Sequence, residues 1–155
     1  MVSYTHMIKI NFNGRVHPKN RAIIRKAADY FMQELLPVRK ANNTFLEIRF
    51  LKMTTDFNGF CHIHDDEEND YSPKSFNIDM NGDLSLDDTL ETLAHEMVHM
   101  RQFRNKELCY REAYTKFNGV AYSINMPYKK QPWEKEAYKL EKKLVKSFHA
   151  ENNKA

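Results

Sequence analysis

The string HEMVH at residues 95–99 constrains this chain more than any other feature, because its two histidines are four residues apart. On a helix with 3.6 residues per turn, positions i and i+4 lie one above the other on one face. Ser85 is a favourable N-cap followed by an acidic first turn. Apolar residues then recur at helical spacing, at Leu86, Leu90, Leu93, Met97 and Met100. The pattern predicts an amphipathic helix from residue 85 through the HEMVH string.

The two histidines lie on a polar stripe of this predicted helix, away from its leucine and methionine stripe. Two imidazoles one turn apart can bind a single Zn²⁺ through ring nitrogens at about 2.0–2.1 Å. Glu96 directly follows His95, and from there its carboxylate can reach a zinc-bound water. We therefore predict that His95 and His99 are metal ligands and that Glu96 is catalytic.

A third protein ligand is expected, because catalytic zinc sites usually have three and keep a fourth position open. Residues 132–137, PWEKEA, open a second amphipathic helix, since proline suits the first helical turn. Glu134 falls on the inward arc of this helix and Glu136 at its margin, and a buried carboxylate is costly unless it is paired or binds a metal. Glu134 is the predicted ligand, with Glu136 as the alternative and Glu141 as a candidate supporting residue. The competing interpretation of Glu134 is a favourable charge at a helix N-terminus.

The HEMVH string and the helix that opens at Pro132 resemble the gluzincin type of zinc metallopeptidase, over roughly residues 57–145. The resemblance is to the compact single-domain kind, which includes the minigluzincins and the SprT-like and phage-encoded metallopeptidases. In that group the third ligand is a glutamate followed three residues later by alanine, which corresponds to Glu134 and Ala137. Two departures are present. Tyr138 stands where many gluzincins have an aspartate oriented toward a ligand histidine, and the third histidine of many SprT-like proteins has no counterpart before His149.

The resemblance implies a zincin-like fold, in which the HExxH helix packs on a sheet and an antiparallel edge strand, here Phe57–His64, borders the cleft. It also implies hydrolysis of a polypeptide substrate, bound along that edge as an extended strand. A tyrosine or histidine usually assists the oxyanion, and the candidates are Tyr110, Tyr114, Tyr122, Tyr128 and Tyr138. The alternative is a degenerate zinc-binding zincin-fold module that binds protein without hydrolysis. The presence of Glu96 argues against that alternative, because metal ligation alone does not require it.

Hydrophobic periodicity predicts the other elements. Alternating patterns indicate four strands, at residues 5–12, 44–53, 57–64 and 75–80. An N-terminal helix is expected over Pro18–Leu36, ending before Pro37. Residues 107–131 are irregular and rich in tyrosine, with a short helix expected near Leu108–Lys116. The order β-α-β-β-β-α-loop-α predicts an α+β fold, with a small mixed sheet packed against the N-terminal helix and the HExxH helix, followed by the C-terminal helix.

Length and composition predict one soluble domain over residues 1–155, since the chain is 41% hydrophobic and 29% charged. A net charge of +3 is too small to indicate nucleic-acid binding, and the clearest lysine cluster lies on the outer face of the C-terminal helix. No signal peptide or transmembrane run is expected, and the oligomeric state stays open. Cys61 and Cys109 show no disulfide pattern, so we expect a cytoplasmic protein with reduced thiols that take no part in the chemistry.

Two weaker clusters precede the HExxH helix. Strand alternation places His62 and His64 on one face, where a second metal site is one interpretation and surface histidines on an edge strand are the favoured one. The acidic run at residues 65–70 has oxygen ligands suited to Ca²⁺, but it lacks the glycine and spacing of an EF-hand. A solvated acidic loop is therefore the favoured interpretation of that run.

Overall fold

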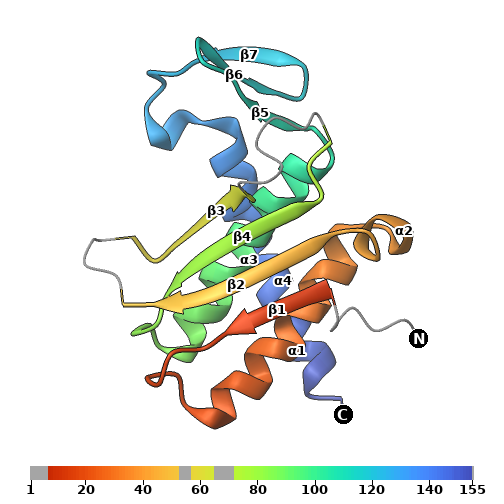
Figure 1. Ribbon diagram of the computed structural model, residues 1–155, viewed down its shortest axis with the longest axis vertical. Coiled ribbons are helices and arrows are strands. Elements are labelled where there is room, and N and C mark those ends of the chain that lie inside the picture. The colour runs from red at the N-terminus through yellow and green to blue at the C-terminus, as the bar shows by residue number, and fades with distance from the viewer. Residues whose placement is uncertain (1–6, 53–56, 65–71, 155) are drawn as a thin grey trace.

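The computed structural model describes residues 7–52, 57–64 and 72–154, and its larger sheet has four strands (Figure 1). These strands lie in the spatial order β1-β2-β4-β3, with bounds β1 (Ile8–Asn11), β2 (Phe45–Leu51), β3 (Gly59–Ile63) and β4 (Ser75–Asn81). Neighbours β1, β2 and β4 are parallel, whereas β3 runs antiparallel to β4 at the sheet edge. The expected antiparallel edge strand is therefore confirmed at β3.

Three long helices lie behind this sheet in Figure 1, on one of its two faces. The helices are α1 (Pro18–Leu35), α3 (Leu86–Arg104) and α4 (Pro132–Asn152), and the single turn α2 (Val38–Ala41) follows α1. Helix α3 is central, because it contacts β3, β4, α1 and α4. The predicted α+β class, with a small mixed sheet covered by the N-terminal helix and the HExxH helix, is confirmed.

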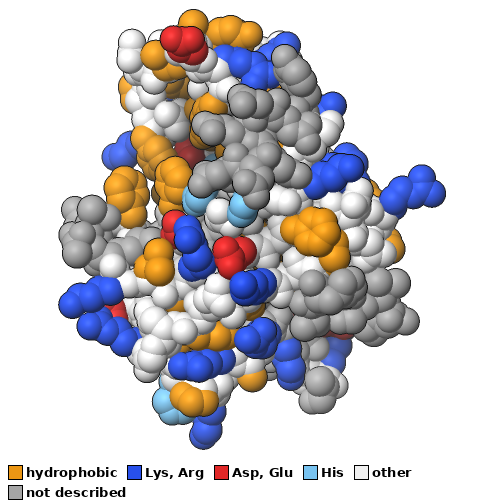
Figure 2. Space-filling model, viewed as in Figure 1, with side chains coloured by type: hydrophobic (Ala, Val, Ile, Leu, Met, Phe, Trp, Pro, Cys, Tyr) orange, Lys and Arg blue, Asp and Glu red, His pale blue; other side chains and the backbone are white. Residues whose placement is uncertain are grey.

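Strand alternation explains which face of the sheet the helices cover. In β2, Leu46, Ile48 and Phe50 are buried in the core, and the residues between them point to the opposite face. That opposite face carries cross-strand charge pairs, such as Arg49 with Asp79 at 2.8 Å between Nη2 and Oδ1. Figure 2 shows basic and acidic side chains interspersed on this side of the molecule. One face of the sheet therefore builds the core, and the other is polar.

Helix α3 begins as the sequence predicts. The Oγ of Ser85 accepts a hydrogen bond from the backbone N–H of Asp88 at 3.2 Å, which satisfies one of the free donors at the helix start. The helix is then buried on nearly all sides from Thr89 to Arg104. Polar side chains that are buried in this way need hydrogen-bond partners. Helix α3 packs between the sheet and α4, and residues of both can supply those partners.

The prediction of a short helix near Leu108–Lys116 is wrong, because that segment forms part of a second sheet. Its three antiparallel strands are β5 (Leu108–Tyr110), β6 (Tyr114–Phe117) and β7 (Val120–Ser123). Burial alternates along β6, which is the period of a strand. Asn118 and Gly119 between β6 and β7 both have positive φ, 49° and 84°, as a two-residue hairpin turn requires. A short 3-10 helix, η3 (Tyr128–Lys130), then leads into α4.

Several smaller predictions concern surface and localisation. No helix within the described ranges has the length and apolar character needed to cross a membrane. Cys61 and Cys109 are both free.

His62 lies beside Asp79, at 3.6 Å between Nε2 and Oδ2, and no cluster of three metal-capable side chains surrounds it in the part of the chain that the structure describes. The acidic run at residues 65–70 lies outside the described residues.

Candidate metal centre

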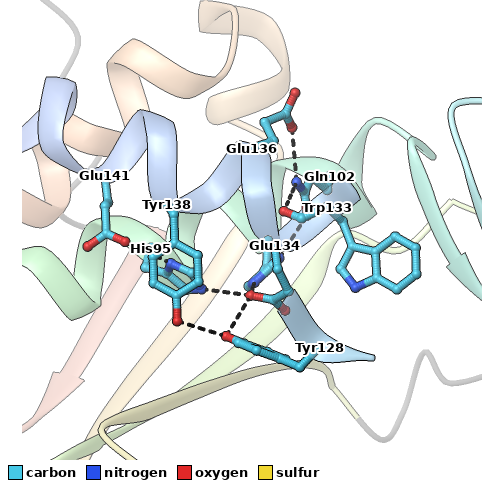
Figure 3. A network of polar contacts seen from close by, with 9 residues as sticks. His95, Gln102, Tyr128, Trp133, Glu134, Glu136, Tyr138 and Glu141 are labelled. Carbon is cyan, nitrogen blue, oxygen red and sulfur yellow. Dashed lines mark hydrogen bonds and ion pairs between the residues drawn. The ribbon is translucent and has the colours of Figure 1, made fainter. Parts of the chain in front are cut away.

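Helices α3 and α4 bring the three predicted ligands together. His95 and His99 project from successive turns of α3, and Glu134 lies in the first turn of α4. The Nε2 atoms of His95 and His99 are 3.0 and 3.1 Å from the same oxygen, Glu134 Oε1. One ligand atom from each of the three residues falls within 4.8 Å of the others, so they form a single cluster. Figure 3 shows the approach of His95 to Glu134.

Each histidine has a second partner on the other side of its ring. His95 Nδ1 donates to Glu141 Oε1 at 3.1 Å, and His99 Nδ1 donates to Gln102 Oε1 at 2.7 Å. A carboxylate or an amide oxygen can only accept, so both Nδ1 atoms carry a proton. In a neutral imidazole, Nε2 then presents a lone pair. Both Nε2 atoms lie within hydrogen-bond distance of Glu134, and each would expose that lone pair to a metal once its proton is displaced. Outer partners of this kind are typical of histidines that bind a metal.

Gln102 fixes the orientation of His99 because every polar atom of its side chain is committed. This fully buried amide donates through Nε2 to the backbone oxygen of Trp133 at 3.0 Å and to Glu136 Oε1 at 2.9 Å. Its Oε1 must therefore face His99. Glu136 also forms an ion pair with Arg101. Glu136, the alternative ligand, is thus engaged outside the cluster, and the structure brings Glu134 to the histidines instead.

Ionisation of the cluster shows how strongly it attracts positive charge. Burial lowers the pKa of His95, but hydrogen bonds to Glu134 and Glu141 outweigh this and raise it to about 9. Burial raises the pKa of Glu134, but hydrogen bonds from His95 and His99 lower it to about 2. Two nitrogens and a carboxylate oxygen that converge in this way hold a proton tightly. A metal cation would compete for the same lone pairs and release that proton.

The donor chemistry fits a divalent metal centre. Two imidazole nitrogens and one carboxylate oxygen are a known ligand set of zinc, in which the fourth position stays open. Both imidazoles have outer acceptors, and Glu134 Oε1 also accepts a hydrogen bond from the Tyr128 hydroxyl at 2.9 Å. Two histidines and one carboxylate also suit ferrous iron, so the residues alone leave two metals to distinguish.

Glu96 lies beside the cluster without joining it. It is 8% exposed and, with His95, lines a cavity of about 430 Å³. Burial raises the pKa of Glu96, and the charges of the two histidines and a backbone hydrogen bond with Cys61 counteract this in part. The hydrogen bond with Cys61 ties the Glu96 carboxylate to β3. Its position is that of a group that can take a proton from a molecule in the cavity.

Gly59 of β3 has no side chain, and Glu96 packs closely against it. A Cβ atom at this position would lie 2.7 Å from Thr92 Cγ2 and 3.1 Å from Glu96 Cγ. We expect Gly59→Ala to lower the free energy of unfolding by about 1–3 kcal/mol, because overpacking forces shifts in the surrounding structure. Urea denaturation measures this loss. Gly14→Ala is the matched control, since a Cβ there meets nothing within 4 Å, and equal stability of the two variants would contradict the close fit.

The structure separates the five tyrosines that the sequence leaves equivalent. The Tyr128 hydroxyl donates to Glu134 and lies 3.1 Å from the Tyr138 hydroxyl (Figure 3). The Tyr138 ring packs on the His95 ring, with centroids 4.6 Å apart. Glu141, three residues after Tyr138, supplies the carboxylate that bonds His95. The contacts of Glu141 with His95 and of Tyr128 with Glu134 depend on how the elements pack in three dimensions. The contact of Gln102 with His99 could be expected from the sequence, because residues three apart on a helix are neighbours.

Three observations within this chain support a metal centre. Donor atoms of His95, His99 and Glu134 converge, each histidine has an outer acceptor, and Glu96, a buried carboxylate beside them, lines a cavity. The contacts of Glu134 with the two histidines and of Glu141 with His95 join residues 35 or more positions apart in the sequence. Comparisons with family models, curated proteins and solved structures find no match to this chain.

Proposed function

We propose that this chain is a zinc-dependent metallopeptidase, with His95, His99 and Glu134 as the metal ligands and Glu96 as the general base. The convergence of two Nε2 atoms on Glu134 Oε1, beside a buried glutamate that lines a cavity, carries the proposal. The alternative is a zinc-binding module that binds protein without hydrolysis. Glu96 favours the enzyme, because burial of a carboxylate that is not a ligand is costly and a hydrolase gives it a role.

The chemistry that zinc supplies, when bound, is acidification of a water molecule and polarisation of the scissile carbonyl. Glu96 would accept the proton of that water and deliver it to the leaving amine, as a positioned general base does. Glu141 and Gln102 keep the two imidazoles in the Nδ1–H form, with their Nε2 atoms directed inward. The Tyr128 hydroxyl bonds Glu134, a proposed ligand, so we take it as the hydroxyl best placed to donate to the substrate carbonyl oxygen.

A polypeptide is the proposed substrate, bound as an extended strand along β3. This strand pairs with β4 on one side and has no partner strand on its other side within the described residues. A free strand edge offers main-chain donors and acceptors to a peptide. Residues at the start of β3 also line the cavity with Glu96. The proposal retains a cytoplasmic location with Cys61 and Cys109 as free thiols that take no part in the reaction.

We expect the purified, zinc-loaded protein to cleave members of a broad peptide library. Removal of the metal with a chelator such as 1,10-phenanthroline should abolish cleavage. Added Zn²⁺ should restore it, because the three ligands are protein side chains that remain in place after the metal is removed. Mass spectrometry of the digest measures cleavage, and elemental analysis distinguishes zinc from iron. Stoichiometric zinc without cleavage of any peptide would contradict the peptidase and support the binding module.

A further inference from the structure

The cavity beside Glu96 extends away from the proposed ligands along α3. Its walls come from the first turns of α3, from α4 and from the start of β3, and they include four carboxylates: Asp88, Glu91, Glu96 and Glu141. No lysine or arginine lines this cavity in the part of the chain that the structure describes. The whole chain carries a net charge of +3, so the acidic lining is a local feature.

Two of these carboxylates already have roles in the metal centre, and two do not. Glu141 bonds His95, and Glu96 is the proposed base. Asp88 and Glu91 are exposed residues that line the cavity wall, and neither is one of the three proposed ligands. A negative charge at Asp88 is favourable simply because it lies in the first helical turn, but this benefit fades by the turn that holds Glu91. The helix dipole therefore contributes little at Glu91.

Glu91 faces another acid. A hydrogen bond with Glu141, followed by burial and the charge of Glu141, raises the pKa of Glu91, while Lys142 on α4 lowers it. Two neighbouring carboxylates disfavour each other's ionised form, and a cation between them removes that penalty. Lys142 does not line the cavity. A positive group that enters the cavity would therefore be favoured by the neighbouring carboxylates of Glu91 and Glu141.

Aromatic rings complete the walls of the cavity. Tyr128 and Tyr138 line one side, and Phe57, which is 64% exposed, lies at the start of β3 on the other. Such rings pack against the alkyl stem of a long side chain and attract a cation through their faces. Carboxylates at one end and aromatic walls along the sides match a lysine or arginine side chain better than an apolar or acidic one.

We propose that this cavity is a subsite for a basic side chain of the peptide substrate, with Asp88 and Glu91 as its specificity-determining residues. The inference rests on the proposed peptidase function and names its substrate class. Glu91 lies one helical turn before His95, and Asp88 lies roughly 10 Å before it along the helix axis. The basic side chain is therefore bound along α3, beside the position where the peptide bond meets Glu96.

Matched peptides test the subsite on the zinc-loaded, full-length protein. The probes are fluorescein-labelled alanine–serine octapeptides in which lysine, norleucine or glutamate is placed at each position in turn. We expect lysine at one position to be favoured over norleucine by about 10-fold in both binding and kcat/KM, a preference that weakens in high salt. The double variant Asp88→Asn, Glu91→Gln should reduce this preference for lysine over norleucine to within about 2-fold. The control is Asp87→Asn, which neutralises an exposed acid next to Asp88 that does not line the cavity.

Measuring binding as well as hydrolysis separates this inference from the proposed function. Hydrolysis without a lysine preference, or a preference that the double variant retains, would overturn the subsite and leave the peptidase standing. Absence of hydrolysis with a lysine preference in binding, lost in the double variant, would overturn the peptidase and leave the subsite standing. An equal loss in Asp87→Asn would show a general effect of negative charge on α3, and would also overturn the subsite.

Discussion

Glu96→Gln should lower peptide hydrolysis by about two or more orders of magnitude, the usual scale for losing a positioned general base. The amide keeps the size of the side chain and its place against β3, but it cannot accept a proton from water. Zinc content should stay at the wild-type level, because none of the three proposed ligands is changed. Elemental analysis and steady-state kinetics on the same preparation measure both quantities.

A matched substitution elsewhere isolates the role of Glu96 from the loss of one negative charge. Glu112 is exposed between β5 and β6 and does not line the cavity, so Glu112→Gln should leave hydrolysis within about 2-fold of wild type. Full activity in Glu96→Gln with zinc bound would rule out the proposed general base. Loss of zinc in this variant would instead show that Glu96 contributes to the metal centre itself.

Glu134→Ala should weaken zinc binding by roughly 100-fold or more, since even outer partners of metal ligands change affinity by about 10–100-fold. The substitution removes the one oxygen that both Nε2 atoms approach. Glu136→Ala is the matched control, two residues away in the same helix. It loses contacts with Arg101 and Gln102, and through Gln102 it should weaken zinc by no more than about 10-fold. Competition with a fluorescent chelator measures both affinities.

The reverse result has a definite meaning. Retention of zinc in Glu134→Ala together with loss in Glu136→Ala would move the third ligand to Glu136. That outcome would require α4 to rotate, because Glu136 now binds Arg101 and Gln102 on the far side of the cluster. The pair of variants therefore tests the placement of α4 as well as the identity of the ligand.

Local sequence signals predict α3 well, because each of them acts within a few residues. The cap at Ser85 and the i, i+4 spacing of His95 and His99 depend only on helix geometry. Glu134 is also predictable, since an inward-facing carboxylate requires a partner. By contrast, the pairing of Glu141 with His95 joins α4 to α3, so it follows from the way the two helices cross, and no pattern in one helix reveals that crossing.

The second sheet was predictable in part and was missed for an identifiable reason. The tyrosine-rich segment 107–131 has short strands of three or four residues, which hydrophobic periodicity resolves poorly. The Asn118-Gly119 pair is nonetheless a strong local signal for a two-residue hairpin. The strand order β1-β2-β4-β3 differs in kind, because it depends on contacts between segments distant in the chain. Such pairing is not encoded in any single window of sequence.

The division of the proposed ligands between two helices has a thermodynamic consequence. His99 and Glu134 are 35 residues apart, so a cation held by both is a reversible cross-link that closes the loop containing β5, β6 and β7. Because the unfolded chain lacks this arrangement, metal binding and docking of α4 on α3 are one linked equilibrium. Each tenfold rise in free metal above its dissociation constant then stabilises the fold by about 1.4 kcal/mol. Metal supply would thereby set the fraction of the protein that is folded as well as its chemistry.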